Sequence, residues 1–132
     1  MNIVGGLFNT TAIRPEIKLL SAILLPKSES YIEDEIFSEL NGVTLSQALY
    51  EALGEVSLEA CRRPRFAPKV QEIMANRYGL LNGQGRLLRD VGKSFGMTRQ
   101  GIFVIERLAL EYLRLPKYRD KLLLYVRTKK SE

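Results

Sequence analysis

The chain has 132 residues, 45% of them hydrophobic, which is enough for one compact domain or a domain with a smaller helical extension. It contains one cysteine and no histidine, so an internal disulfide is excluded and the commonest general base and metal ligand is missing. We therefore expect no enzyme, no cofactor and no metal site. No apolar run approaches the roughly 20 residues of a membrane span, so a soluble protein without a membrane partner is expected.

The two halves of the chain carry opposite net charges. Residues 1–60 have three basic and nine acidic side chains, a net charge of −6, whereas residues 61–132 have seventeen basic and six acidic ones, a net charge of +11. This asymmetry is typical of a nucleic-acid-binding half joined to a half with another task. The alternative is that the acidic half neutralises the basic half within one fold.

Helical periodicity dominates the acidic half, and no alternating strand pattern is found. Pro15 suits the first turn of a helix that Pro26 ends. Ser30 and Glu33 have capping-box spacing ahead of a second helical segment over 36–40. Asn41-Gly42 then marks a turn.

A long amphipathic helix follows that turn. Thr44 and Gln47 form the capping box that opens it. Its regular apolar stripe is expected to be core or a subunit interface. The stripe consists of Leu45, Ala48, Leu49, Ala52, Leu53, Val56 and Ala60.

Segment 62–68 contains two prolines and three arginines and is predicted to be a basic linker between the halves. Residues 1–61 would then be an acidic helical region with a partner-binding or regulatory role, and residues 69–132 a second domain. In that domain we expect a helix up to Gly79, a loop rich in glycine and asparagine, helices over 86–95 and 98–115, and a last helix over 117–127 after Pro116.

The helices on either side of Gly96 fit the requirements of a helix-turn-helix unit. Such a unit needs a small residue where the two helices cross, which Gly92 supplies, and a residue that adopts positive φ in the turn, which is Gly96. It also needs buried apolar side chains at fixed offsets. These are Val91, Phe95, Met97, Ile102 and Ile105. The sequence therefore predicts an all-α helical bundle with a C-terminal helix-turn-helix.

The same residues resemble a known family. The run from Val91 to Ile102, followed by Ile105-Glu106, Ala109-Leu110 and Leu113-Arg114, is similar to the fourth conserved region of bacterial sigma-70 family sigma factors. The flanking segments 74–80 and 115–126 are also similar to that region. The resemblance covers about residues 70–126.

The resemblance implies a transcription factor with two partners, the flap of the RNA polymerase β subunit and promoter DNA, in the cytoplasm and at the nucleoid. It implies that Thr98, Arg99 and Gln100 lie at the start of the recognition helix, with Arg99 reading guanine through O6 and N7. Further candidates for DNA contact on and after that helix are Phe103, Val104, Arg107, Arg114 and Lys117. The candidates for partner contact are Leu49, Leu53, Val56, Met74 and Tyr78.

Two departures from the family pattern are informative. Gly101, Phe103 and Val104 stand where primary sigma factors commonly carry arginine or glutamine, so the last two would either touch thymine methyl groups or form a protein-binding patch. No segment resembles the aromatic-rich region that melts promoters. We therefore expect the protein to act with another sigma subunit or a regulatory protein. The alternative function is a stand-alone helix-turn-helix DNA-binding adaptor or repressor, such as one encoded by a phage.

Overall fold

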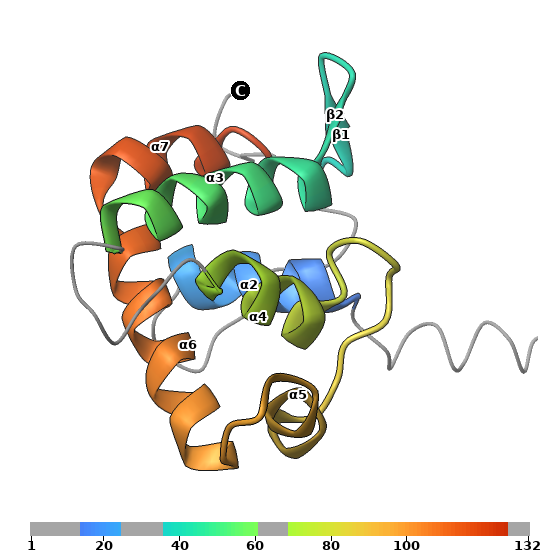
Figure 1. Cartoon of the computed structure of the whole chain (residues 1–132). Coiled ribbons are helices and arrows are strands. Elements are labelled where there is room, and N and C mark those ends of the chain that lie inside the picture. Colours follow the sequence, from blue (N-terminus) through green and yellow to red (C-terminus); the bar gives the residue numbers. More distant parts are fainter. Residues whose placement is uncertain (1–13, 25–35, 61–68, 127–132) are drawn as a thin grey trace, which may run out of the picture.

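The computed structural model describes residues 14–24, 36–60 and 69–126, which form a mostly helical protein (Figure 1). Its helices confirm the all-α expectation: α2 (Pro15–Leu24), α3 (Leu45–Ala60), α4 (Val70–Tyr78), α5 (Leu88–Phe95), α6 (Arg99–Leu113) and α7 (Pro116–Leu123). The Ser30–Glu33 capping box, Pro26 and the basic segment 62–68 lie outside the described residues. None of the described helices is long and apolar enough to cross a membrane.

The helices are arranged in stacked layers (Figure 1). Helices α3 and α7 lie side by side at one end of the molecule, α2 and α4 lie beneath them, and α5 is at the opposite end. Helix α6 runs along one side and connects the α5 end to the α7 end. Because α6 contacts α2, α3 and α4 as well as its sequence neighbours, it fixes α5 relative to the rest of the protein.

One hydrophobic core joins the two halves of the chain. Helix α2 is buried at seven of its ten positions and contacts α3, α4, α6 and α7. The apolar stripe of α3 is buried as predicted at Leu45, Leu49, Leu53, Val56 and Ala60, whereas Ala48 and Ala52 lie at its edge. A helix that is apolar on almost every side is stable only when other elements surround it. The acidic half and the basic half thus share a single core.

A short β-hairpin precedes α3 and corrects the expectation of a helical segment over 36–40. Strands β1 (Glu39–Leu40) and β2 (Val43–Thr44) pair antiparallel, with Leu40 opposite Val43. Asn41 and Gly42 both have positive φ, at 53° and 84°, as a two-residue type I′ turn requires. The Asn-Gly pair was therefore a hairpin signal, and two-residue strands are too short to show an alternating pattern.

Helix boundaries follow local chemistry in most places. The Thr44 hydroxyl oxygen accepts a 3.1 Å hydrogen bond from the backbone N–H of Gln47, as predicted. Gly79 ends α4 in the left-handed conformation with φ 60°. Pro116 occupies the first turn of α7, which ends at Leu123, four residues before the predicted end. The N-terminal end of α5 is Leu88, two residues later than predicted, and the backbone of Arg86 is bonded to α4 instead: its N–H donates to the carbonyl oxygen of Arg77, and its carbonyl oxygen accepts from the Arg77 guanidinium.

Candidate nucleic-acid interface

Helices α5 and α6 meet at a tight turn of three residues. Gly96 has φ 66°, and the N–H of Met97 donates a 2.8 Å hydrogen bond to the carbonyl oxygen of Gly92. A Cβ atom added to Gly92 would lie 2.5 Å from the carbonyl oxygen of Met97. The two glycines therefore have the roles that the sequence predicts: Gly92 permits the close approach and Gly96 permits the turn.

The N-terminal end of α6 is capped by a side chain. Thr98 has an extended backbone conformation, and its hydroxyl oxygen accepts a 3.0 Å hydrogen bond from the N–H of Gly101. Arg99 and Gln100 follow directly and are exposed. The first turn of α6 thus presents two long polar side chains and free backbone N–H groups to solvent.

The outer face of α6 continues from this end with a different character. Phe103 is 41% exposed and Val104 is 46% exposed. The Arg107 guanidinium carbon lies 5.9 Å from the centroid of the Phe103 ring, in cation–π contact. The opposite face is buried against the core through Ile102, Ile105, Ala109 and Leu113.

Three arginines lie around one hollow of about 320 Å³ between α4, α5 and α6. Arg89 and Arg99 line it together with Leu87 and Leu88, and Arg77 lies on its α4 side. Arg89 also forms an ion pair with the neighbouring Asp90 at 3.6 Å. Arg89 could not be predicted from the sequence, because ten residues separate it from Arg99 and only the fold brings them together.

Two buried or half-buried polar groups fix the α5–α6 unit on α4. Glu106 is 8% exposed, lies 3.6 Å from the Nε atom of Arg77 and accepts a hydrogen bond from the hydroxyl of Tyr78. Burial raises the pKa of Tyr78 well above its ordinary range, and the hydrogen bond to the Glu106 carboxylate raises it further. Arg86 donates to Asn76 on α4 and to Ser94 on α5. In the sequence, the buried position of Glu106 is indicated by its place in the apolar repeat of α6.

Two of the residues predicted to contact phosphate, Arg114 and Lys117, interact with other parts of the protein in the structure. The guanidinium of Arg114 donates to the carbonyl oxygen of Ala22 from Nε at 3.2 Å and from Nη2 at 2.8 Å. Arg114 therefore caps the C-terminal end of α2, where carbonyl groups lack helical partners. Lys117 is exposed, but its ammonium group forms an ion pair with Glu59. Neither side chain lies free on the exposed face of α6 that carries Arg99 and Phe103.

Four of the five predicted partner contacts are core residues in this structure. Leu49, Leu53, Val56 and Met74 have no exposed surface. A partner cannot touch them unless the core opens, because their apolar side chains are covered by neighbouring helices. Tyr78 is half-buried and is held by Glu106.

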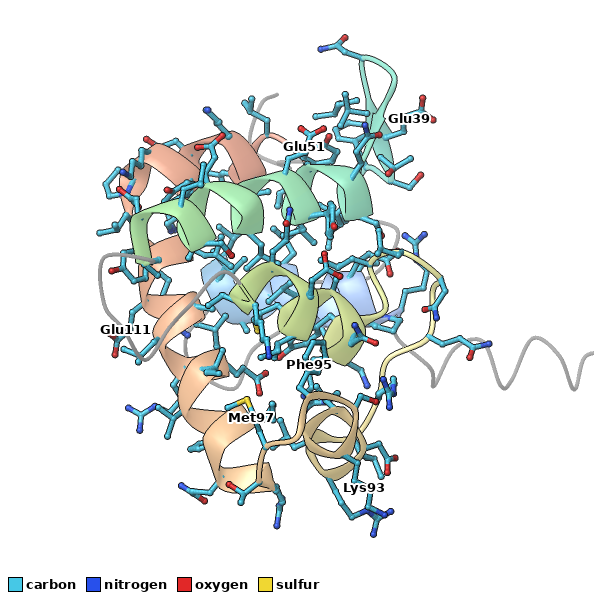
Figure 2. All side chains as sticks on the ribbon, viewed as in Figure 1. Glu39, Glu51, Lys93, Phe95, Met97 and Glu111 are labelled. Atoms are coloured by element: carbon cyan, nitrogen blue, oxygen red, sulfur yellow. The ribbon has the colours of Figure 1, made fainter. Side chains whose placement is uncertain are left out.

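The two ends of the molecule differ in charge: the α5 end is mainly basic, whereas the end formed by α3 and α7 carries both signs, with Lys117 and Lys121 of α7 as well as the glutamates of α3. Figure 2 shows Lys93 projecting at the α5 end and Glu39 and Glu51 at the opposite end, beside the hairpin and α3. The basic end carries the exposed residues Arg89, Lys93, Arg99 and Arg107. A surface of this kind attracts an anionic partner to one end of the molecule.

A helical protein in which a tight turn joins two helices, the second of them capped and exposed at its start, has the features of a helix-turn-helix protein. Comparison with known proteins relates this chain to bacterial sigma-70 family sigma factors. The principal sigma factor HrdC of Streptomyces coelicolor is 39% identical over 58 residues, which is 44% of this chain. The sigma factor SigA of Clostridium acetobutylicum is 31% identical over 96 residues, or 73% of this chain, and RpoD of Neisseria gonorrhoeae is 31% identical over 94 residues, or 71%.

The similarity covers a small part of each relative. The matched segment spans 17% of HrdC, 25% of SigA and 14% of RpoD. No protein-family model and no solved structure matches the chain. The resemblance predicted from the α5–α6 residues is thus confirmed as a relation to sigma factors over a segment of their length.

Proposed function

We propose that this chain is a sigma-like transcription factor that binds RNA polymerase core and inserts the N-terminal end of α6 into the major groove of promoter DNA. The observation that carries the proposal is the exposure of Arg99 and Gln100 in the first turn of α6, directly after the Thr98 cap. The residues at the start of the second helix of such a unit are the ones that reach base edges.

Each exposed side chain at this end suits a particular DNA group. The fork of Arg99 matches O6 and N7 of guanine, and the amide of Gln100 matches N6 and N7 of adenine. Phe103 and Val104 donate no hydrogen bonds, so they suit thymine methyl groups. Arg89 and Arg107 flank these residues and suit phosphate oxygens, while Thr98 lies close enough to the helix end to approach a phosphate.

The polymerase part of the proposal follows from the relatives, whose names describe RNA polymerase sigma factors. We propose that the contact on polymerase is the β-flap, as the sequence resemblance implies. Promoter opening would then be supplied by another sigma subunit or a regulatory protein. Because Leu49, Leu53, Val56 and Met74 are buried, the flap would have to use other surface residues or displace part of the core.

The first test measures sequence-specific DNA binding. Binding sites are selected from a random DNA library with the full chain, and affinities for the selected and an unrelated duplex are compared at one salt concentration. Arg99→Ala should reduce the preference for the selected site by about 5- to 150-fold, which corresponds to the loss of one bidentate base contact. Lys121→Ala, an exposed cation on α7, is the matched control and should leave the preference unchanged. An Arg99→Ala variant with unchanged preference would refute the assignment of α6.

A stand-alone DNA-binding adaptor or repressor is the second candidate, and the burial of the four predicted partner residues favours it. The tagged chain is purified from its own host together with RNA polymerase core that has or lacks the β-flap tip. Flap-dependent recovery supports the sigma-like function. Recovery of no polymerase, with specific DNA binding intact, supports the adaptor.

A further inference from the structure

The outer face of α6 carries a row of apolar side chains and charges that continues beyond the DNA-reading end. Phe103 and Val104 begin the row, Arg107 and Glu111 follow it toward the C-terminal end of α6, and Leu115, the 42% exposed residue that precedes α7, lies just past that end. At 1.5 Å per residue, the rise along α6 from Phe103 to Glu111 is about 12 Å. Figure 2 shows Glu111 projecting from α6 away from the rest of the protein.

A hollow lies at the C-terminal end of this row. Leu108, Glu111, Tyr112 and Leu115 line it, and its volume is about 220 Å³. The N-terminal end of the row carries the exposed side chains of Phe103 and Val104. One end of α6 thus offers apolar protrusions and the other an apolar depression.

The two charges have opposite signs and are four residues apart. Within residues 14–24, 36–60 and 69–126, neither Arg107 nor Glu111 takes part in an ion pair. Two copies of α6 that pack antiparallel about a two-fold axis near Ala109 would bring Arg107 of each copy beside Glu111 of the other. The same axis brings Phe103 and Val104 of each copy to the Leu115 end of the other, where the hollow lies.

We propose that this face of α6 is a self-complementary surface on which a second copy of the chain docks. A two-fold interface requires that one patch complement itself. Along this face the protruding Phe103 and Val104 come first, then Arg107, then Glu111, and last the hollow. Reversed on a second copy, this order places each protrusion at a hollow and each positive charge at a negative one. A contact along about 12 Å of a single helix buries much less surface than the 1,200–2,000 Å² of standard interfaces, so the dimer is weak and reversible.

The dimer has a consequence for DNA, which rests on the proposed function. Phe103, Val104 and Arg107 belong both to this surface and to the proposed groove contact, so a copy cannot use them for both at once. Self-association and DNA binding are therefore competitive, and DNA shifts the equilibrium toward monomer. Such coupling lowers the fraction of the protein that is DNA-binding monomer as the protein accumulates.

The test is sedimentation equilibrium of the full chain from low micromolar to submillimolar concentration, without DNA. Glu111→Arg and Arg107→Glu should each weaken the dimer about tenfold, because each change turns both symmetric ion pairs into like-charge pairs. The double variant R107E/E111R restores the opposite charges and should recover wild-type dimerisation. Glu55→Arg, the same charge change at an exposed position on α3, is the control and should not alter it.

The outcomes separate this inference from the proposed function. A chain that is monomeric at every concentration, or a dimer that Glu111→Arg does not weaken, overturns the docking surface. Recovery in the double variant supports it, since a folding defect in either single variant would not be repaired by a second reversal. Arg99→Ala should dimerise normally, so failure of DNA recognition with an intact, charge-dependent dimer would remove the proposed function and leave this surface standing.

Discussion

The substitution Gly92→Ala tests how the turn between α5 and α6 is built. Gly92 lies in α5 with an ordinary helical backbone, so alanine meets no conformational barrier there. Its methyl group, however, would lie 2.5 Å from the carbonyl oxygen of Met97 and 3.3 Å from the carbonyl carbon of Thr98. Both neighbours are backbone atoms of the turn, which cannot rotate away as a flexible side chain can.

The expected magnitude comes from two opposing contributions. Replacing a helical glycine by alanine stabilises a helix by about 1 kcal/mol. Relief of the clash requires a shift of the turn by roughly 1 Å, which strains the packing at a cost of about 1–3 kcal/mol and weakens the Met97–Gly92 hydrogen bond, worth about 1 kcal/mol. The net expectation is a loss of about 1–3 kcal/mol in the free energy of unfolding, or roughly 3–12 °C in Tm.

Gly101→Ala is the matched control, with the same chemical change in the neighbouring helix. Its methyl group would meet the terminal Cε of Met97 at 3.2 Å, and a methionine end can move aside. The helix-propensity gain should therefore dominate, and the variant should be more stable by up to about 1 kcal/mol. Urea unfolding followed by far-UV circular dichroism measures both variants on one scale.

The sign of the change in unfolding free energy on Gly92→Ala shows whether the close approach at Gly92 constrains the turn. If Gly92→Ala is as stable as or more stable than the wild type, the close approach of α5 to the turn is not a constraint, and glycine is not required at this position of the α5–α6 unit. If it is destabilised, DNA binding should weaken as well, because Thr98 and Arg99 follow the displaced Met97 directly. A variant that is destabilised but binds DNA with unchanged preference would show that the proposed interface does not depend on the geometry of the turn.

Three further predictions concern single contacts. Thr98→Ala should cost about 1 kcal/mol in urea unfolding because the α6 cap is lost, whereas Thr98→Ser should retain the cap. Arg114→Ala should lower the free energy of unfolding by about 1.5–3 kcal/mol but leave the salt dependence of DNA binding unchanged. Arg107→Ala should reduce the slope of log K against log salt by about 1. Equal slopes for the two variants would contradict the assignment of Arg107 to phosphate and of Arg114 to the cap of α2. The raised pKa of Tyr78 means that the unfolded chain loses this proton first, so stability should fall by about 1.4 kcal/mol per pH unit above pH about 10. Tyr78→Phe should flatten that alkaline decline in thermal unfolding by the same amount.

The helices and the turn could be predicted because their signals are local. Capping residues, prolines and glycines act on backbone groups within four residues of themselves, so Thr44, Gly79, Gly96 and Thr98 have the predicted roles. The hairpin before α3 was missed although its Asn-Gly turn was identified. Its strands have two residues each, and they are stabilised by contact with the chain end, where the N–H of Phe37 donates to the carbonyl oxygen of Tyr125.

The candidate interface was predictable in part for the same reason. Arg99, Gln100, Phe103 and Val104 are exposed because the 3.6-residue repeat of α6 turns them away from Ile102 and Ile105. The fate of Arg114 depends instead on α2, which lies 92 residues earlier in the sequence at Ala22. No local pattern distinguishes an arginine that caps a distant helix from one that is free to bind phosphate.

The partner contacts stay a prediction, because an apolar stripe on a helix is the same signal for a core and for an interface. The sequence could show that Leu49, Leu53 and Val56 must be covered, but not by what. In the structure the chain covers them itself, with α2 among the helices that contact α3. A polymerase contact at these residues would therefore have to replace interactions that the folded chain already makes. Separating two large apolar side chains that are packed together would cost several kcal/mol.

The distribution of charge distinguishes the two sequence-based interpretations of the acidic half. If that half neutralised the basic half, acidic side chains of residues 1–60 would face the cations of α5 and α6. Among the described residues, the ion pair found between the halves is Glu59 with Lys117 at the α7 end. Glu39 and Glu51 lie at the end of the molecule opposite Lys93 (Figure 2). Within the described residues, these acidic side chains thus lie away from the cations near the start of α6, which favours attraction of an anion to that start.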